Sequence, residues 1–176
     1  MATGPYTWEL VRRLAHKCSG TRYRLFYDPH QGGYPAIRDA VACHPSPYFG
    51  EHSSSSTLSV VDVAILDTSA QQVVLVIEVE EHGAEPKRVI GDLVNIALAD
   101  AITLSPYQYE FQRPLGMILG IRVNPAGKGE EKVTRIAERL NALFGNRVFV
   151  TPLFSGSLDD LINAIGRAAL RKLNLC

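Results

Sequence analysis

Residues 58–80 read LSVVDVAILDTSAQQVVLVIEVE. Within them, 58–66 and 73–80 are two runs rich in β-branched residues, separated by a polar connector, and such runs are typical of β-strands. Both runs are apolar at successive positions, so we expect both faces of each strand to be covered by other elements. The pair therefore predicts central strands of a sheet with helices on each side, which is an α/β fold.

Strand and helix patterns alternate outside this stretch. Thr7 is the expected N-cap of the first helix, and Pro86 suits the first turn of the second, whose apolar spacing extends through Ala101. The expected helices cover 8–17, 86–105, 130–144 and 157–173, and the other expected strands cover 40–43, 115–123 and 147–153. The sequence thus predicts a single domain, residues 1–176, with a central mixed sheet of about five strands flanked by helices.

The composition is that of an ordinary globular protein. The chain has 176 residues, of which 46% are hydrophobic and 20% are charged, and this length suits one α/β domain. Lys plus Arg and Asp plus Glu each number 18, so the net charge is zero. A protein that coats DNA without specificity is therefore not expected. The charge is uneven along the chain: the charged residues of 1–24 are mostly basic, and those of 28–81 are mostly acidic.

Several classes of protein are disfavoured by what the sequence lacks. Cys18, Cys43 and Cys176 lie far apart with no C-x-x-C spacing, which argues against a disulfide framework and favours a cytoplasmic location. No segment approaches the roughly 18 apolar residues of a membrane span, and no signal-peptide pattern is present, so no membrane partner is expected. No P-loop or G-x-G-x-x-G motif is present, so no nucleotide cofactor is expected.

Three acidic side chains fall on the two central strands. Glu78 and Glu80 are two residues apart, so we expect them to share one face of their strand with Val74 and Val76. An antiparallel hairpin with a loop over 68–72 places Asp62 beside Glu78, and a neighbouring register places it beside Glu80. Either register brings the three carboxylates together.

Such a cluster has two interpretations. Buried carboxylates repel one another, and a hard divalent cation such as Mg²⁺ offsets the repulsion. The same ion polarises a phosphoryl group and lowers the pKa of a bound water, which is the chemistry of phosphodiester hydrolysis. In the other interpretation Glu80 and Glu81 are solvated at a strand end, Asp62 caps a backbone group and Glu78 pairs with an arginine. Spacing alone favours neither interpretation.

The order of these residues resembles the PD-(D/E)xK nuclease superfamily over residues 7–123. A helix that carries Glu9 precedes a strand with Asp62, and after a turn a second strand carries Glu78-Val79-Glu80 before a helix. The resemblance implies a restriction-endonuclease-like fold and a metal-dependent endonuclease that cuts DNA, with type II restriction enzymes as the nearest kind.

Two positions depart from the family motif. Val61 stands where the motif has proline, and Glu80 stands where most members have lysine. Some type II restriction endonucleases are similar in using a Glu-x-Glu version and are active. In other members a lysine from a neighbouring element supplies the missing group. Lys87, at the start of the following helix, is the candidate here, with a merely solvated lysine as the alternative.

The resemblance also implies a role for each residue. Asp62 and Glu78 would hold Mg²⁺, for which Mn²⁺ can substitute, and Glu80 would be a further ligand or would orient the attacking water. Glu9 would support this site or help to bind a second metal, and Lys87 would act beside the metal. Site-specific cleavage by a homodimer is expected by the same likeness. The alternative function is a catalytically inactive nuclease fold that binds DNA or serves in assembly.

Overall fold

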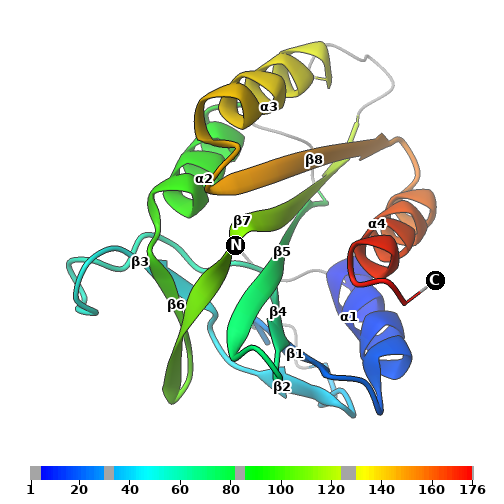
Figure 1. The fold of residues 1–176 in the computed structure, drawn as a ribbon. Helices are drawn as coiled ribbons and strands as arrows, with labels where there is room; N and C mark the ends of the chain where they lie inside the picture. The colour runs from blue at the N-terminus through cyan, green and yellow to red at the C-terminus, as the bar shows by residue number, and fades with distance from the viewer. Residues whose placement is uncertain (1–4, 30–33, 82–85, 124–129, 176) are drawn as a thin grey trace.

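The computed structural model describes residues 5–29, 34–81, 86–123 and 130–175, without the side chains of residues 86–88 (Figure 1). In chain order the elements are α1 Pro5–Cys18, β1 Tyr23–Tyr27, β2 Ala40–Ala42, β3 Ser46–Tyr48, β4 Val63–Asp67, β5 Gln72–Glu80, α2 Pro86–Leu98, β6 Ala101–Leu104, β7 Tyr107–Arg122, α3 Glu130–Phe144, β8 Val148–Ser155 and α4 Leu158–Lys172. The strands form one mixed sheet in the order β2-β1-β4-β5-β7-β6-β3, and β8 pairs with β7. Within the described ranges, no helix has the length and apolar character that a membrane span requires.

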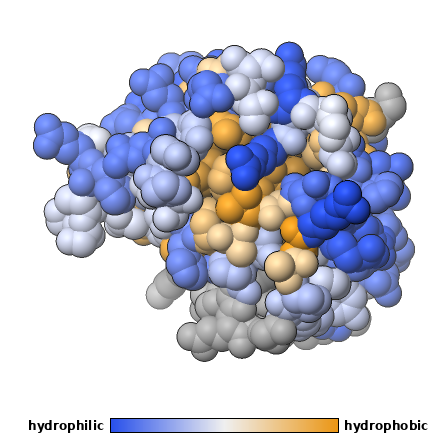
Figure 2. Space-filling view, turned by 90° about the horizontal axis from the view of Figure 1, so that it is seen from below, coloured by the Kyte–Doolittle hydropathy of each residue, from blue (hydrophilic) through white to orange (hydrophobic). Residues whose placement is uncertain are grey.

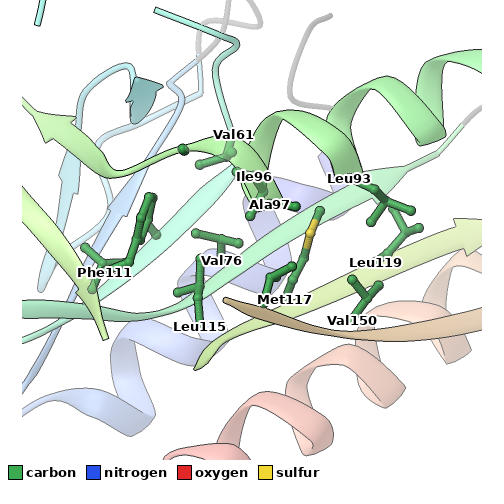
Figure 3. Close-up of a cluster of buried hydrophobic side chains, with 14 of the residues drawn as sticks. Val61, Val76, Leu93, Ile96, Ala97, Phe111, Leu115, Met117, Leu119 and Val150 are labelled. Atoms are coloured by element: carbon green, nitrogen blue, oxygen red, sulfur yellow. The ribbon is translucent and has the colours of Figure 1, made fainter. Parts of the chain in front are cut away.

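Helices cover both faces of the sheet, as the two apolar runs predict. The α1 and α4 helices lie side by side on one face, and α2 and α3 lie on the other (Figure 1). Each face has its own hydrophobic core. In the core under α2, Leu93 and Ile96 of that helix pack over Val76 of β5 and over Met117 and Leu119 of β7 (Figure 3). The α/β class is therefore confirmed.

The sheet is larger than predicted. The described part of the chain has eight strands, three more than the five predicted segments, and the additional ones are β1, β3 and β6. In addition, β7 begins at Tyr107 rather than near residue 115 and is 16 residues long. Its first part pairs with β6 and its second part pairs with β8. One long strand thus joins two regions of the sheet.

The second helix is shorter than predicted. It ends at Leu98, and residues 101–104 form β6, in which Ile102 and Leu104 are buried at alternate positions. The apolar residues of this region are compatible with both a helix and a strand, because short apolar runs do not distinguish the two periods.

Two arginines from distant parts of the sequence bind the end of α2. The Nε of Arg147 donates to the carbonyl of Ala97 over 3.0 Å, and its Nη2 donates to the carbonyl of Ala99 over 3.1 Å. Arg113 of β7 also donates to the Ala99 carbonyl. These bonds satisfy the last carbonyls of the helix, which would otherwise lack partners where the helix ends.

The first helix also begins differently. The described part of α1 starts at Pro5, so Thr7 lies in the helix and is not its N-cap as predicted. At the other end of the chain, the predicted cap of α4 is confirmed, because the Ser157 side chain accepts a hydrogen bond from the backbone N–H of Asp160.

The strands β4 and β5 form the predicted antiparallel hairpin. Their ladder extends from the pair Val63 and Ile77 to the pair Asp67 and Gln72. The loop is therefore 68–71, which is one residue shorter than the predicted loop.

A β-bulge accounts for the difference in loop length. The register shifts between Ile65 and Leu66, so one residue of β5 has no counterpart on β4. As a result Val74 packs on the side of α1 and α4, whereas Val76 packs on the side of α2. The prediction that Val74 shares a face with Glu78 is wrong for this reason.

Candidate functional site

The three predicted carboxylates lie on the face of the sheet that α2 covers. Glu78 and Glu80 follow Val76 along β5 at steps of two residues, so they point to the same side as Val76. Asp62 directly precedes β4, and extending the ladder by one pair places it opposite Glu78. The register that puts Asp62 beside Glu78 is confirmed, and the register that puts it beside Glu80 is wrong.

Asp62 and Glu78 stand side by side on the two paired strands. Asp62 is half-buried and Glu78 is buried, and the charge of Asp62 helps to raise the pKa of Glu78. Asp62 Oδ2 accepts the backbone N–H of Val79 over 2.8 Å. Asp62 thus binds a backbone group, as the second interpretation of the sequence expects, and lies beside a second acid.

Burial changes the protonation of this pair. Glu78 is 8% exposed, and its burial, together with the charges of Asp62 and Asp92, raises its pKa well above the usual value. Burial also raises the pKa of Asp62 to about 7, against the opposing effect of the Val79 N–H and with a further contribution from the Glu80 charge. Both acids therefore keep their protons to a higher pH than solvated carboxylic acids do.

Glu80 is buried rather than solvated. Its exposed fraction is 6%, although it is the last residue of β5. The expectation that the end of this strand lies in water is therefore wrong. Its neighbour on β7 is Ile121, which belongs to the core under α2, so the Glu80 carboxylate stands at the edge of an apolar region.

Three further residues adjoin the cluster and were missed by the sequence analysis. Asp28 directly follows β1 and is buried, and its backbone N–H donates to the carbonyl of Asp62 over 3.0 Å. Asp28 Oδ1 lies 2.8 Å from Nδ1 of the exposed His44. Asp92, on α2, adds its charge near Glu78. A prediction of strand β1 would have placed Asp28 at a strand end, which is the signal that was available.

Glu9 lies away from these carboxylates. It is on α1, which packs on the opposite face of the sheet. Its carboxylate binds Arg12 Nε at 2.7 Å and Arg13 Nε at 2.6 Å. These hydrogen bonds lower the pKa of Glu9 to about 2. The structure therefore brings Glu9 to two arginines and does not bring it to the cluster.

Lys87 is in the first turn of α2, and its side chain lies outside the described residues. The backbone nonetheless starts α2 shortly after Glu80, as the sequence predicts.

The residue after the cluster has a structural role that the sequence did not indicate. Glu81 is buried, and its Oε1 accepts both the backbone N–H and the hydroxyl of Thr7, each over 2.8 Å. A carboxylate at this point satisfies a free N–H in the first turn of α1 and interacts favourably with the helix dipole. Glu81 therefore fixes the start of α1 to the end of β5.

The chemistry of the donor set suits a hard divalent cation. Asp62, Glu78 and Glu80 offer carboxylate oxygens, and Mg²⁺ in proteins is often held by one or two carboxylates together with waters. Among the residues that the structure describes, no group of three or more His, Cys, Asp or Glu side chains is arranged to enclose a metal ion. The chain matches no protein family, curated protein or solved structure at a significant level.

Proposed function

We propose that the protein is a metal-dependent endonuclease that hydrolyses DNA phosphodiester bonds. The placement of Asp62 opposite Glu78 on the paired strands β4 and β5, where burial raises the pKa of both carboxyl groups, is the observation that carries the proposal. Two neighbouring acids, one half-buried and one buried, are costly when both are ionised, and a divalent cation removes that cost by neutralising their charges. Burying two hydrophobic side chains would cost less free energy than burying two acids, so the acids are best explained by a function.

Each residue of the cluster has a role in this proposal. Asp62 and Glu78 would hold Mg²⁺ or Mn²⁺, and Glu80 would be a further ligand or would orient the attacking water. When bound, the metal would polarise the phosphoryl group and lower the pKa of a bound water. The water oxygen would bond to phosphorus, the bond from phosphorus to the leaving oxygen would break, and the proton lost by the water would pass to that oxygen. Lys87 is proposed to act beside the metal because α2 begins shortly after Glu80 in the chain.

The proposal extends to the fold, the recognition of specific sites and the oligomeric state. The central hairpin, with its acids on one face and helices on both sides of the sheet, supports a restriction-endonuclease-like fold. The zero net charge favours site-specific recognition over general attraction to DNA. We further propose a homodimer that acts in the cytoplasm, by likeness to enzymes that cut palindromic sites.

A cleavage assay tests the activity. Supercoiled plasmid and phage genomic DNA are incubated with the protein in Mg²⁺, in Mn²⁺ or in EDTA, beside Asp62→Asn and Glu78→Gln. These variants keep the size of each side chain and remove its charge. The control is Glu131→Gln, on the exposed surface of α3. We expect metal-dependent cleavage by the wild type and the control, with none by the two site variants. Discrete bands would indicate site-specific cleavage.

The second candidate is a nuclease-like fold without activity, which Glu80 favours because it replaces the lysine of most members. This candidate predicts that a folded wild-type protein cuts neither substrate in either metal. It also predicts that any DNA binding survives Asp62→Asn. That combined result would overturn the proposed activity.

A further inference from the structure

A groove lies between α1 and α4, on the face of the sheet opposite the acidic cluster. Its volume is about 430 Å³, and both helices contribute to its walls. The two helices are adjacent along this side of the molecule (Figure 1). A bond across the groove, from Arg13 Nη1 to Asn163 Oδ1 at 2.8 Å, holds them together at one point.

The floor of the groove is apolar. Leu10 and Leu14 of α1 and Ile162 of α4 line it, and these side chains are at most 1% exposed. Gly166 of α4 lines it as well, and a Cβ placed there would have Leu10 Cδ1, at 3.9 Å, as its nearest neighbour. The absence of a side chain at Gly166 therefore leaves a recess that an apolar group of a ligand can occupy.

The walls of the groove are basic. Arg12, Arg13, His16, Lys17 and Arg167 line it, and no aspartate or glutamate does. Glu9 neutralises part of the charge of Arg12 and Arg13.

Two of these basic side chains, Lys17 and Arg167, have no acidic partner among the described residues. Both are on the surface. Because the chain as a whole is neutral, this positive potential is a property of the groove rather than of the whole surface.

We propose that this groove binds an acidic amphipathic helix of a protein partner. Apolar side chains at i, i+3, i+4 and i+7 of such a helix would fill the floor, and flanking carboxylates would meet Lys17 and Arg167. A nucleic-acid backbone would satisfy the same cations, but it would leave the apolar floor over Gly166 unfilled. The apolar floor therefore favours the peptide. This inference is independent of the proposed nuclease activity.

Fluorescence anisotropy with a defined peptide tests the inference. The probe is a labelled helical peptide of about four turns, with leucines at the spacing above and glutamates on either side of them. A peptide of the same composition in scrambled order is its control. The protein variants are Gly166→Leu, which fills the recess, and the double variant Lys17→Glu with Arg167→Glu. Arg139→Glu, on the exposed surface of α3, controls for charge reversal elsewhere.

We expect saturable binding of the patterned peptide and binding of the scrambled peptide that is weaker by about tenfold or more. Gly166→Leu and the double variant should each weaken binding by about tenfold, and Arg139→Glu should leave it unchanged. Leucine favours a helix over glycine, so Gly166→Leu should remain folded. Equal binding of both peptides, or full binding by Gly166→Leu, would overturn the inference. A single-stranded oligonucleotide that displaces the peptide and binds less tightly to both variants would identify a nucleic-acid groove instead.

Discussion

Asp62 lies opposite Glu78 across the hairpin of β4 and β5, and burial raises the pKa of both carboxyl groups. The pair lies at the start of β4 and on the face of β5 that α2 covers. Desolvation by the surrounding protein is the largest cause of both shifts. The pair is therefore sensitive both to pH and to a cation that competes with the proton.

The first prediction concerns stability and pH. The pKa of Asp62 is raised from 3.8 to about 7 in the folded protein, so between these values the folded state binds more protons than the unfolded state. The free energy of unfolding then falls as pH rises through this window. Asp62→Asn should remove much of that fall and stabilise the protein at pH 8 by on the order of 1 kcal/mol. Urea denaturation across this pH range measures both effects.

Glu131→Gln serves as the control for this series, because Glu131 is exposed on α3 and pairs with Arg135 at the surface. It should leave the pH dependence of stability unchanged. A wild-type protein whose stability rises steadily from pH 4 to pH 7 would contradict the raised pKa of Asp62.

The second prediction concerns the start of α1. Glu81→Ala removes the acceptor of the Thr7 N–H and hydroxyl, and we expect a loss of about 1 to 2 kcal/mol in the free energy of unfolding. Glu81→Gln keeps an acceptor oxygen and should cost less. Urea denaturation followed by circular dichroism measures the change. Glu138→Ala, on the exposed surface of α3, should be close to neutral, and an equal loss in the two alanine variants would contradict the role of Glu81.

The sequence pattern of neighbouring residues was enough to predict the hairpin at the centre of the sheet. The β-branched runs predicted the hairpin of β4 and β5, and its register followed from alternation along two strands. The end of α2 could not be predicted in this way, because it is bound by Arg147, about 50 residues further along the chain. Because this contact is not visible in the local sequence, the apolar residues of β6 were assigned to the helix.

The candidate site was predictable to a similar extent. Asp62 and Glu78 were found because the spacing of a hairpin brings them together. Glu9 was assigned from the order of acidic residues along the chain, and order does not indicate which face of the sheet a helix covers. Asp28 reaches the cluster through the pairing of β1 with β4, which links segments that are distant in sequence.

The third prediction concerns the close packing of α4 on β7. A Cβ at Gly120 would lie 2.2 Å from Ile165 Cδ1 and 3.0 Å from Ile165 Cγ1, so Gly120→Ala should cost about 1 to 3 kcal/mol in the free energy of unfolding. Gly91→Ala, on α2, is the matched control, because among the described residues a Cβ there meets no atom within 4 Å beyond its chain neighbours and its own helix backbone. It should be neutral or stabilising by up to about 1 kcal/mol. Chemical denaturation distinguishes the two, and equal effects would show that Ile165 moves aside at little cost.

The fourth prediction concerns metal binding, measured by thermal unfolding without any DNA. Because the pKa of Asp62 and that of Glu78 are raised, a cation bound by these carboxylates competes with protons, so Mg²⁺ or Mn²⁺ should raise Tm more at pH 8 than at pH 5. A ligand at about 100 times its Kd adds about 2.7 kcal/mol to the stability of the folded state. For a domain of this size, that corresponds to a rise in Tm of roughly 5 to 10 °C.

Three variants show whether this shift arises at the acidic cluster. Asp62→Asn and Glu78→Gln should remove it, because each takes away a carboxylate from the pair. Glu9→Gln should retain it, because Glu9 is bound by Arg12 and Arg13 on the opposite face of the sheet. Loss of the shift in Glu9→Gln together with its survival in Asp62→Asn would place the metal elsewhere. A shift of equal size at pH 5 and pH 8 would show that the cation does not compete with the proton of the pair.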